Sequence, residues 1–577
     1  MKSASIAEGI RPPGRPFSLP FRRLRAAGNL RLGAALSVAL VALPVIALAF
    51  AAARGSGDLW PHLIRHVLPH AMVETALLLA GVGAFVIGVG TGTAWLVSCH
   101  RFPGRRSFAW ALVLPLALPT YVSAYAWLDV LHPAGPVQAG LRAILGVTDP
   151  RAIPLPEIRS LPGCIMVMGS VLFPYVYLAA RAAFLTQGAD LLRAGRGLGA
   201  GGMRLFLTIG LPMAWPAIAA GASLALLETL NDVGAAEFLG VRTLTVSVYV
   251  TWITRSSLEG AAQIALMILA IVAALLALEG WARSRAHGAH GVRENARPDR
   301  RQLPPAAGLL AMLFCLVPVL LGFVVPVSYL VWAAWRRVEE FGLPPDLLTW
   351  IGNSATLSAA ATLLILPAAL VLAFGARGDA MPDRKAMGGS VLLRASLMGY
   401  ALPGGIAAVG LIVALGGLDD LTEGFGPWIP ALSGTAAALV LAYFVRFLAI
   451  PAGGLDAAYA RIRPQMDWSA RSMGAPPGRI LWRVHLPLLL PALSAAALLV
   501  FLDAMKELPA TLLLRPFNRE TLATALYAEA ARGTYEEGAV AALALVVVGL
   551  PVIALLVAGG RPKARSGKRM RPNEARP

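Results

Sequence analysis

The sequences GAGGMRLFLTIGLP at residues 199–212 and GAPPGRILWRVHLP at residues 474–487 follow one pattern. In each, a glycine is followed by nine residues, an aliphatic residue, one further residue and Leu-Pro. Glycine permits a positive φ and hence a sharp reversal of the chain, and proline is tolerated in the first turn of a helix. We therefore expect each stretch to be a reversal that leads into a long helix.

The two stretches belong to a longer internal repeat, because residues beyond them match at the same offset of 275 positions. The matched residues include two acidic positions in each copy. Within a copy these acids are four residues apart, so we expect each pair to lie on one face of a helix. The pairs at this offset are Gly199 and Gly474, Pro212 and Pro487, Glu228 and Asp503, and Asp232 and Glu507.

The composition indicates a membrane protein rather than a soluble enzyme. Of the 577 residues, 57% are hydrophobic and 14% are charged, whereas about 25% charged residues is usual. A helix that crosses a bilayer needs about 20 mostly apolar residues. We expect an all-α polytopic membrane protein with about twelve spans, six in each repeat. The apolar runs begin near Leu32, Glu74, Ser107, Leu161, Leu211 and Gly260, and near Pro305, Ile351, Val391, Trp428, Leu486 and Gly538.

These runs divide the chain into five parts. We predict a basic tail at 1–31, a first domain at 32–282, a linker at 283–304, a second domain at 305–560 and a basic tail at 561–577. Because six spans per repeat is an even number, both repeats face the same way across the membrane.

The charge distribution predicts the orientation. The net charge is +19, and 37 of the 50 Lys and Arg residues lie in alternate connecting segments and the two tails, against 13 in the other loops. Because cationic loops are retained in the cytoplasm, we expect both termini there, and we attribute the positive charge to this bias rather than to nucleic-acid binding.

The two repeated stretches lie in segments that the topology places in the cytoplasm, Arg181 to Gly210 and Arg446 to His485. Apolar side chains in such loops indicate a docking partner. The pattern resembles the EAA loop of permeases of binding-protein-dependent ABC transporters. That resemblance implies two tandem MetI-like permease domains, a coupling helix in each loop that contacts one of two ATPase subunits, a periplasmic substrate-binding protein, and a site in the bacterial inner membrane.

The resemblance assigns the coupling role residue by residue, with one departure. Arg193-Ala194-Gly195 and Trp468-Ser469-Ala470 stand where Glu-Ala-Ala is typical, so the acidic residue is missing from both copies. Any ion pair that it makes with the ATPase elsewhere in the family is therefore in doubt here. The remaining coupling residues implied are Gly199, Ile209, Leu211, Pro212, Gly474, Val484, Leu486 and Pro487.

Within that family the sequence most resembles the fused permeases of ferric iron transporters. Three strings carry the likeness: LPLALPTYVSAYAW at 114–127, ETLNDVGAAEFLGVRTLTVSVY at 228–249 and DAMKELPATLLLRPFNRETLATALY at 503–527. The resemblance implies import of ferric iron from periplasm to cytoplasm. Relatives for thiamine and for phosphonates share the fused architecture, so those substrates are alternatives.

The four acids are candidate contacts for a passing metal ion. We place Glu228, Asp232, Asp503 and Glu507 at the outer ends of the fifth and eleventh spans. Carboxylates suit a hard cation, and ionisable groups near a bilayer usually face the bundle interior. The alternative is that these acids end the spans, pair with neighbours such as Lys506 or meet the binding protein.

Motifs for catalysis and for nucleotide binding are missing from the sequence. It has no G-x-x-x-x-G-K-[ST] phosphate loop, no H-E-x-x-H and no G-x-S-x-G. We expect no catalytic residue and no bound cofactor, with ATP used by a separate subunit. A gradient-driven carrier with two six-span halves is the alternative from another class, although such a carrier is expected to place its ionisable residues mid-membrane.

Overall fold

The computed structural model describes residues 20–147, 149, 156–186, 194–284, 300–379, 389–423 and 432–559. Arg193, most of the predicted linker and the predicted C-terminal tail lie outside these described residues. The first helix begins at Pro20, inside the range assigned to the N-terminal tail. Below, the first half denotes residues up to 284, and the second half denotes residues from 300 onward.

In the described part of the first half, helices are joined by turns, short loops and one two-residue strand. Its elements are α1 (Pro20–Arg54), α2 (Leu59–His62), η1 (Leu63–Val67), α3 (Leu68–Cys99), β1 (His100–Arg101), α4 (Arg105–Ala111), η2 (Leu114–Ala117), α5 (Thr120–Val130), α6 (Pro136–Leu145), α7 (Leu161–Thr186), α9 (Gly202–Leu205), η3 (Phe206–Gly210), α10 (Leu211–Asn231), α11 (Val233–Phe238), α12 (Leu244–Ile253) and α13 (Leu258–Ser284).

The second half has a similar order of elements. They are β2 (Arg301–Gln302), α14 (Pro305–Val319), η5 (Leu320–Val324), α15 (Val325–Phe341), α16 (Leu347–Asp379), α17 (Gly389–Leu397), η6 (Met398–Ala401), α18 (Gly404–Glu423), α19 (Ala436–Phe447), α20 (Ala449–Tyr459), α21 (Pro464–Ser472), α22 (Pro477–Ile480), η7 (Leu481–His485), α23 (Leu486–Met505), α24 (Pro509–Leu514), α25 (Leu522–Arg532) and α26 (Tyr535–Gly559). Strand β2 pairs with β1 in parallel.

The all-α polytopic fold is confirmed. Among the described residues, nine helical segments are long and apolar enough to cross a bilayer, and two bent helix pairs raise the number to eleven. The bent pairs are α4–η2 with α5, at 93°, and α19 with α20, at 41°. Helix α26 covers the twelfth predicted run.

Several spans are broken where proline interrupts the backbone ladder. Helix α5 follows Pro119, and α18 begins just after Pro403, at equivalent places in the two halves. Turns of π-helix precede Leu211-Pro212 and Leu486-Pro487, where the proline has no N–H to donate to the preceding turn. The predicted reversals and the helices beginning at Leu211 and Leu486 are confirmed.

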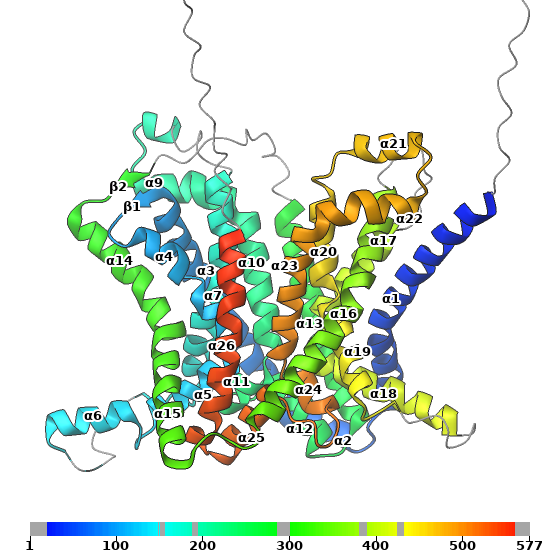
Figure 1. The fold of residues 1–577 in the computed structure, drawn as a ribbon. Helices are drawn as coiled ribbons and strands as arrows, with labels where there is room; N and C mark the ends of the chain where they lie inside the picture. The colour runs from blue at the N-terminus through cyan, green and yellow to red at the C-terminus, as the bar shows by residue number, and fades with distance from the viewer. Residues whose placement is uncertain are drawn as a thin grey trace, which may run out of the picture.

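The two halves are interlocked rather than separate. Helix α1 packs against α16, α17 and α18 of the second half, while α14 packs against α3 and α4 of the first half. Figure 1 shows α1 and α14 on opposite flanks of the bundle. Each core cluster therefore contains side chains from both halves.

The ends of the bundle differ. One end carries α9, α21 and α22, and we name it the α21 end; the other carries α6, α12 and α25, and we name it the α6 end (Figure 1). The first residues of α1 and the last residues of α26 both lie toward the α21 end (Figure 1). The two described chain ends thus lie on one side of the bundle.

Candidate functional site

Polar side chains from both halves meet at the centre of the bundle, around a cavity of about 80 Å³. Four are carboxylates and two are cationic. We name these residues, with one amide, the central polar cluster: Glu228, Asn231, Asp232, Arg446, Asp503, Lys506 and Glu507. Thr120, Tyr121 and Tyr175 line the same cavity.

Breaks in the fifth and eleventh predicted spans place the acids of this cluster. Asp232 follows the end of α10, and its carboxylate accepts a hydrogen bond from the Ala235 N–H at 2.9 Å, so it caps α11. Glu507 lies at the equivalent break after α23 and accepts from the Ala510 N–H at 3.0 Å. The Thr120 hydroxyl also donates to Asp232. The caps satisfy backbone donors that each helix start leaves without an intrahelical partner.

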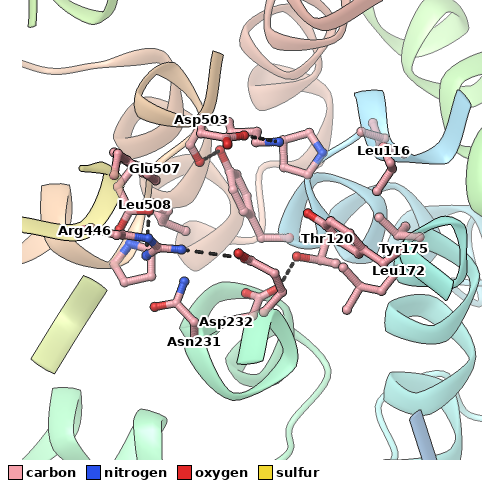
Figure 2. A pocket seen from close by; sticks show the side chains of 18 residues that line it. Leu116, Thr120, Leu172, Tyr175, Asn231, Asp232, Arg446, Asp503, Glu507 and Leu508 are labelled. Carbon is pink, nitrogen blue, oxygen red and sulfur yellow. Dashed lines mark hydrogen bonds and ion pairs between the residues drawn. The ribbon is translucent and has the colours of Figure 1, made fainter. Parts of the chain in front are cut away.

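Arg446 links the acids of the two halves. Its guanidinium lies 2.8 Å from the Glu507 carboxylate and 3.6 Å from that of Glu228. Figure 2 shows Arg446 beside Glu507. Arg446 is 6% exposed. A second contact between the halves lies beside it, where the Gly404 N–H donates to the Asn231 side chain at 2.6 Å. The cluster therefore joins the halves as well as lining the cavity.

One prediction about these residues is wrong. A helix break separates Glu228 from Asp232 and Asp503 from Glu507, so neither pair shares one helix face. The acids do lie where the fifth and eleventh predicted spans end, at the ends of α10 and α23. Those ends lie within the bundle, since Val171 and Tyr175, from the middle of α7, line the same cavity. The alternative pairing of Asp503 with Lys506 is present, at 2.8 Å.

Sequence reasoning missed Arg446 as a site residue, because it was assigned to the start of a cytoplasmic loop. The structure places it inside the bundle, on α19, and the chain leaves the bundle only after α20 ends at Tyr459. The signal was available, since Arg446 is the single basic residue in the apolar run from Ala436 to Tyr459, whose one other charged residue is Asp456. A charge in such a run is a functional candidate by default.

A larger cavity adjoins the cluster on its α21 side. It measures about 450 Å³ and shares Tyr175, Asp503 and Lys506 with the smaller one. Its other walls include Leu224 and Leu499, which precede the cluster residues on α10 and α23. Because both helices run from the α21 end toward the cluster, the larger cavity extends from the cluster toward that end (Figure 1).

The two repeated loops adopt the same reversal at the α21 end. Gly199 has a φ of 81° and Gly474 a φ of 77°. In each loop the residue after the glycine donates its N–H to a carbonyl five residues earlier, Ala200 to Gly195 and Ala475 to Ala470, both at 3.0 Å. This is the Schellman helix end, which favours glycine at the left-handed position.

The predicted coupling residues present matching faces in the two copies. Ala194 and Ser469 are exposed, whereas Gly195 and Ala470 are buried. Trp468 is exposed, and so are its loop neighbours Met473, at 82%, and Trp482, at 66%. Further described residues of the predicted set are half-buried or exposed and precede or begin the following spans: Ile209, Leu211, Pro212, Val484, Leu486 and Pro487.

The loops differ in how they are anchored. Asp467, 1% exposed, binds Arg377 of α16 and His485 of η7, each at 2.5 Å. The first loop is held by aromatic packing instead, with the Trp95 ring 5.2 Å from that of Phe206. His100 lies beside Trp95. Burial, together with the nearby Arg196, lowers the pKa of His100, so the neutral form of its imidazole is favoured.

Comparison with known proteins identifies relatives in one functional class, although no family model matches the chain. The chain is 26% identical over 499 residues to the Fe(3+)-transport system permease protein FbpB 2 of Haemophilus influenzae, covering 85% of this chain and 90% of the relative. It is 30% identical over 203 residues to the molybdenum transport system permease protein ModB of Escherichia coli, covering 34% and 85%. A putative 2-aminoethylphosphonate transport system permease protein, PhnU of Salmonella choleraesuis, is 28% identical over 279 residues, covering 47% and 96%.

Proposed function

The chain belongs to the ABC transporter permeases, and from that premise we propose that it is the fused, two-domain membrane subunit of an importer for ferric iron. The first-named relative matches it across both halves, whereas ModB, one of the half-length relatives, covers about a third of it. Membership of this family favours an ATP-driven importer over the gradient-driven alternative.

The charge of the central polar cluster is the observation that carries the choice of cargo. Four carboxylates face two cationic side chains there, so the path has an excess of two negative charges when all six groups are ionised. Carboxylate oxygens suit a hard cation. An oxyanion such as molybdate would meet this excess as repulsion, which costs more in a site with little water.

The loops at the α21 end support the assignment of partners. Their two reversals at Gly199 and Gly474 offer two similar faces, which suits two copies of a cytoplasmic ATPase subunit. In this arrangement the α21 end faces the cytoplasm of a bacterium, both termini lie there, and a periplasmic binding protein delivers cargo at the α6 end. The chain itself is a transport subunit without a catalytic residue or a cofactor of its own.

The arrangement of cavities suggests how the chain works. The larger cavity lies between the cluster and the α21 end, and the cavity at the cluster is much smaller, so we propose that this state faces inward. Closure of the ATPase subunits would move the coupling loops, reverse this arrangement and admit cargo from the binding protein. Such coupling requires that nucleotide, binding protein and cargo each favour different states.

Uptake by cells tests the cargo. Cells that lack this gene should lose ATP-dependent uptake of labelled ferric iron, and the gene should restore it. Uptake of labelled molybdate, 2-aminoethylphosphonate and thiamine should be the same with and without the gene. Intact iron uptake together with loss of one of the others would overturn the ferric assignment and keep the permease.

Molybdate is the second candidate, because the 30% identity to ModB covers 85% of that relative. Its oxyanion would contact Arg446 and Lys506 rather than the carboxylates. Substituting glutamine for Glu228 and Glu507 separates the two, since the loss of negative charge should weaken uptake of a cation and strengthen uptake of an anion.

A further inference from the structure

Arg446 breaks the symmetry of the repeat at its centre. The offset of 275 positions matches Arg446 with Val171 and Phe447 with Leu172, and all four residues line the central cavity. One half thus contributes a cation at a position where the other half contributes an aliphatic side chain.

The position of this cation makes it a counter-ion for both halves. Its guanidinium is 2.8 Å from Glu507 and 3.6 Å from Glu228, and these two carboxylates come from different halves. Buried carboxylates without a compensating charge are strongly unfavourable. In the absence of cargo, Arg446 supplies that compensation and holds the halves together at the point where the path is closed.

Arg446 is also connected mechanically to a coupling loop. It lies two residues before Leu448, where α19 and α20 meet at a bend of 41°. Helix α20 ends at Tyr459, and α21 begins at Pro464. The equivalent helix of the first half, α7, has no such division between Leu161 and Thr186. A movement of α21 therefore reaches Arg446 through one short helix and one bend.

From these observations we infer that Arg446 is the gate of the path, a tethered counter-ion that closes it between transport events. Movement of α21 changes the bend at Leu448 and withdraws the guanidinium from Glu228, and an arriving cation takes its place beside the carboxylates. This inference rests on the proposed function, since it assumes that cationic cargo passes the cluster. It also makes the second half the one that carries the gate.

Leakage through the permease alone tests the gate. The full-length chain is reconstituted into vesicles that contain calcein, and entry of Co²⁺ without ATP is followed as quenching of the dye. Arg446→Met should admit Co²⁺ about tenfold faster than the wild type, which corresponds to the lower end of the coupling energies measured for close charge pairs at a protein interface. Arg446→Lys, which keeps the charge, should stay near the wild-type rate.

Two further variants keep the result decisive. The double variant Arg446→Gln with Glu507→Gln preserves the net charge of the cluster, so no buried charge is left without its counter-ion and the chain is expected to fold. It should still leak, because the ion pair between Arg446 and Glu228 is gone. Arg337→Met breaks an ion pair with Glu537 elsewhere in the bundle and should not leak. Wild-type rates in both Arg446→Met and the charge-balanced variant would overturn the gate, and so would equal leakage in Arg337→Met.

A parallel influx of labelled molybdate separates the gate from the cargo assignment. Leakage of Co²⁺ without molybdate supports a cation path, whereas leakage of molybdate alone overturns the inference that a cation replaces Arg446. The vesicle assay uses no iron, so its result on the gate stays valid even if the uptake assay in cells assigns a different cationic cargo. If iron uptake depends on the gene and no variant leaks, the gate alone is wrong.

Discussion

At the scale of single residues, the left-handed glycine at the end of α21 is a requirement of the coupling loop. Gly474 has a φ of 77°, which costs an L-residue about 1–2 kcal/mol. Gly474→Ala should therefore depopulate the ordered loop about five- to thirtyfold and reduce uptake several-fold at normal membrane levels. Gly478→Ala is the matched control, because Gly478 has no positive φ and open space around it. Equal uptake by the two variants would contradict the prediction.

A second glycine is required by packing rather than by its φ. A Cβ on Gly404 would lie inside van der Waals contact of both the Glu507 carboxylate and the Arg446 guanidinium. Both contacting atoms are the ends of side chains that can move, so Gly404→Ala should push the two side chains apart and reduce transport several-fold. The neighbouring Gly405→Ala should be tolerated, because its Cβ would meet only Pro509 and Leu513, at 3.8 and 3.9 Å. Uptake assays at matched expression compare them, and a functional Gly404→Ala would show that this close approach is dispensable.

Individual residues differ in how readily the sequence reveals them. Gly199 and Gly474 could be predicted, because a glycine repeated at the same place before a helix indicates a positive φ, which glycine adopts without a steric penalty. Gly404 could not, because its role depends on which helices approach each other across the two halves. Arg446 could be singled out as a basic residue in an apolar run, but its partners in the other half could not. The acids were found by type and register, yet their true geometry was missed. A spacing of four residues describes one face only while the helix continues, and the helix ends between the members of each pair.

At the scale of elements, α21 is held in place by a buried ion-pair network. Arg377 of α16 donates to Asp467 and also to the Tyr459 and Ile462 carbonyls, at 2.8 and 3.1 Å. Breaking such a buried pair by removing one partner costs about 3–5 kcal/mol. Asp467→Asn should therefore loosen α21 and lower the uptake achieved per ATP hydrolysed by the complex with its ATPase. The ratio is informative because general misfolding would lower both quantities together.

The matched control lies in the preceding helix. Asp456 is an exposed acid of α20, so Asp456→Asn should leave the ratio of uptake to hydrolysis unchanged. An unchanged ratio in Asp467→Asn as well would mean that the network stabilises the fold without transmitting movement.

Spans were predicted well at this scale, whereas interruptions were not. Long apolar runs report burial in lipid regardless of tertiary context, so the beginnings near Leu161, Leu211, Pro305 and Leu486 agree with helix starts. The bends at 93° and 41° lie beside prolines, Pro119 at the first and Pro451 just after the second. Apolar runs continue through such bends, which is why hydropathy alone treats them as straight spans.

At the scale of the whole molecule, the two halves are interlocked, although the sequence predicts two domains that follow one another along the chain. Helix α1 crosses to the second half, where Gly410 of α18 lies against the Pro44 carbonyl and ring so closely that a Cβ has no room. In lipid, helices associate through such close packing of small residues rather than through a hydrophobic driving force. Each half therefore lacks part of its own core when it is alone.

Cutting the chain between the halves tests this dependence. If residues 1–290 and 291–577 are expressed together as separate chains, they should assemble, copurify through a tag on one of them and restore uptake. Either half expressed alone should be degraded, because α1 or α14 then exposes the face that packs on the missing half. Gly410→Val in the second fragment should prevent copurification by displacing α1, whereas Gly417→Val, where a Cβ meets nothing within 4 Å, should not. A stable half-chain would mean that the two repeats fold independently and only later exchange helices, and the gate at Arg446 would then have to act across a separable interface.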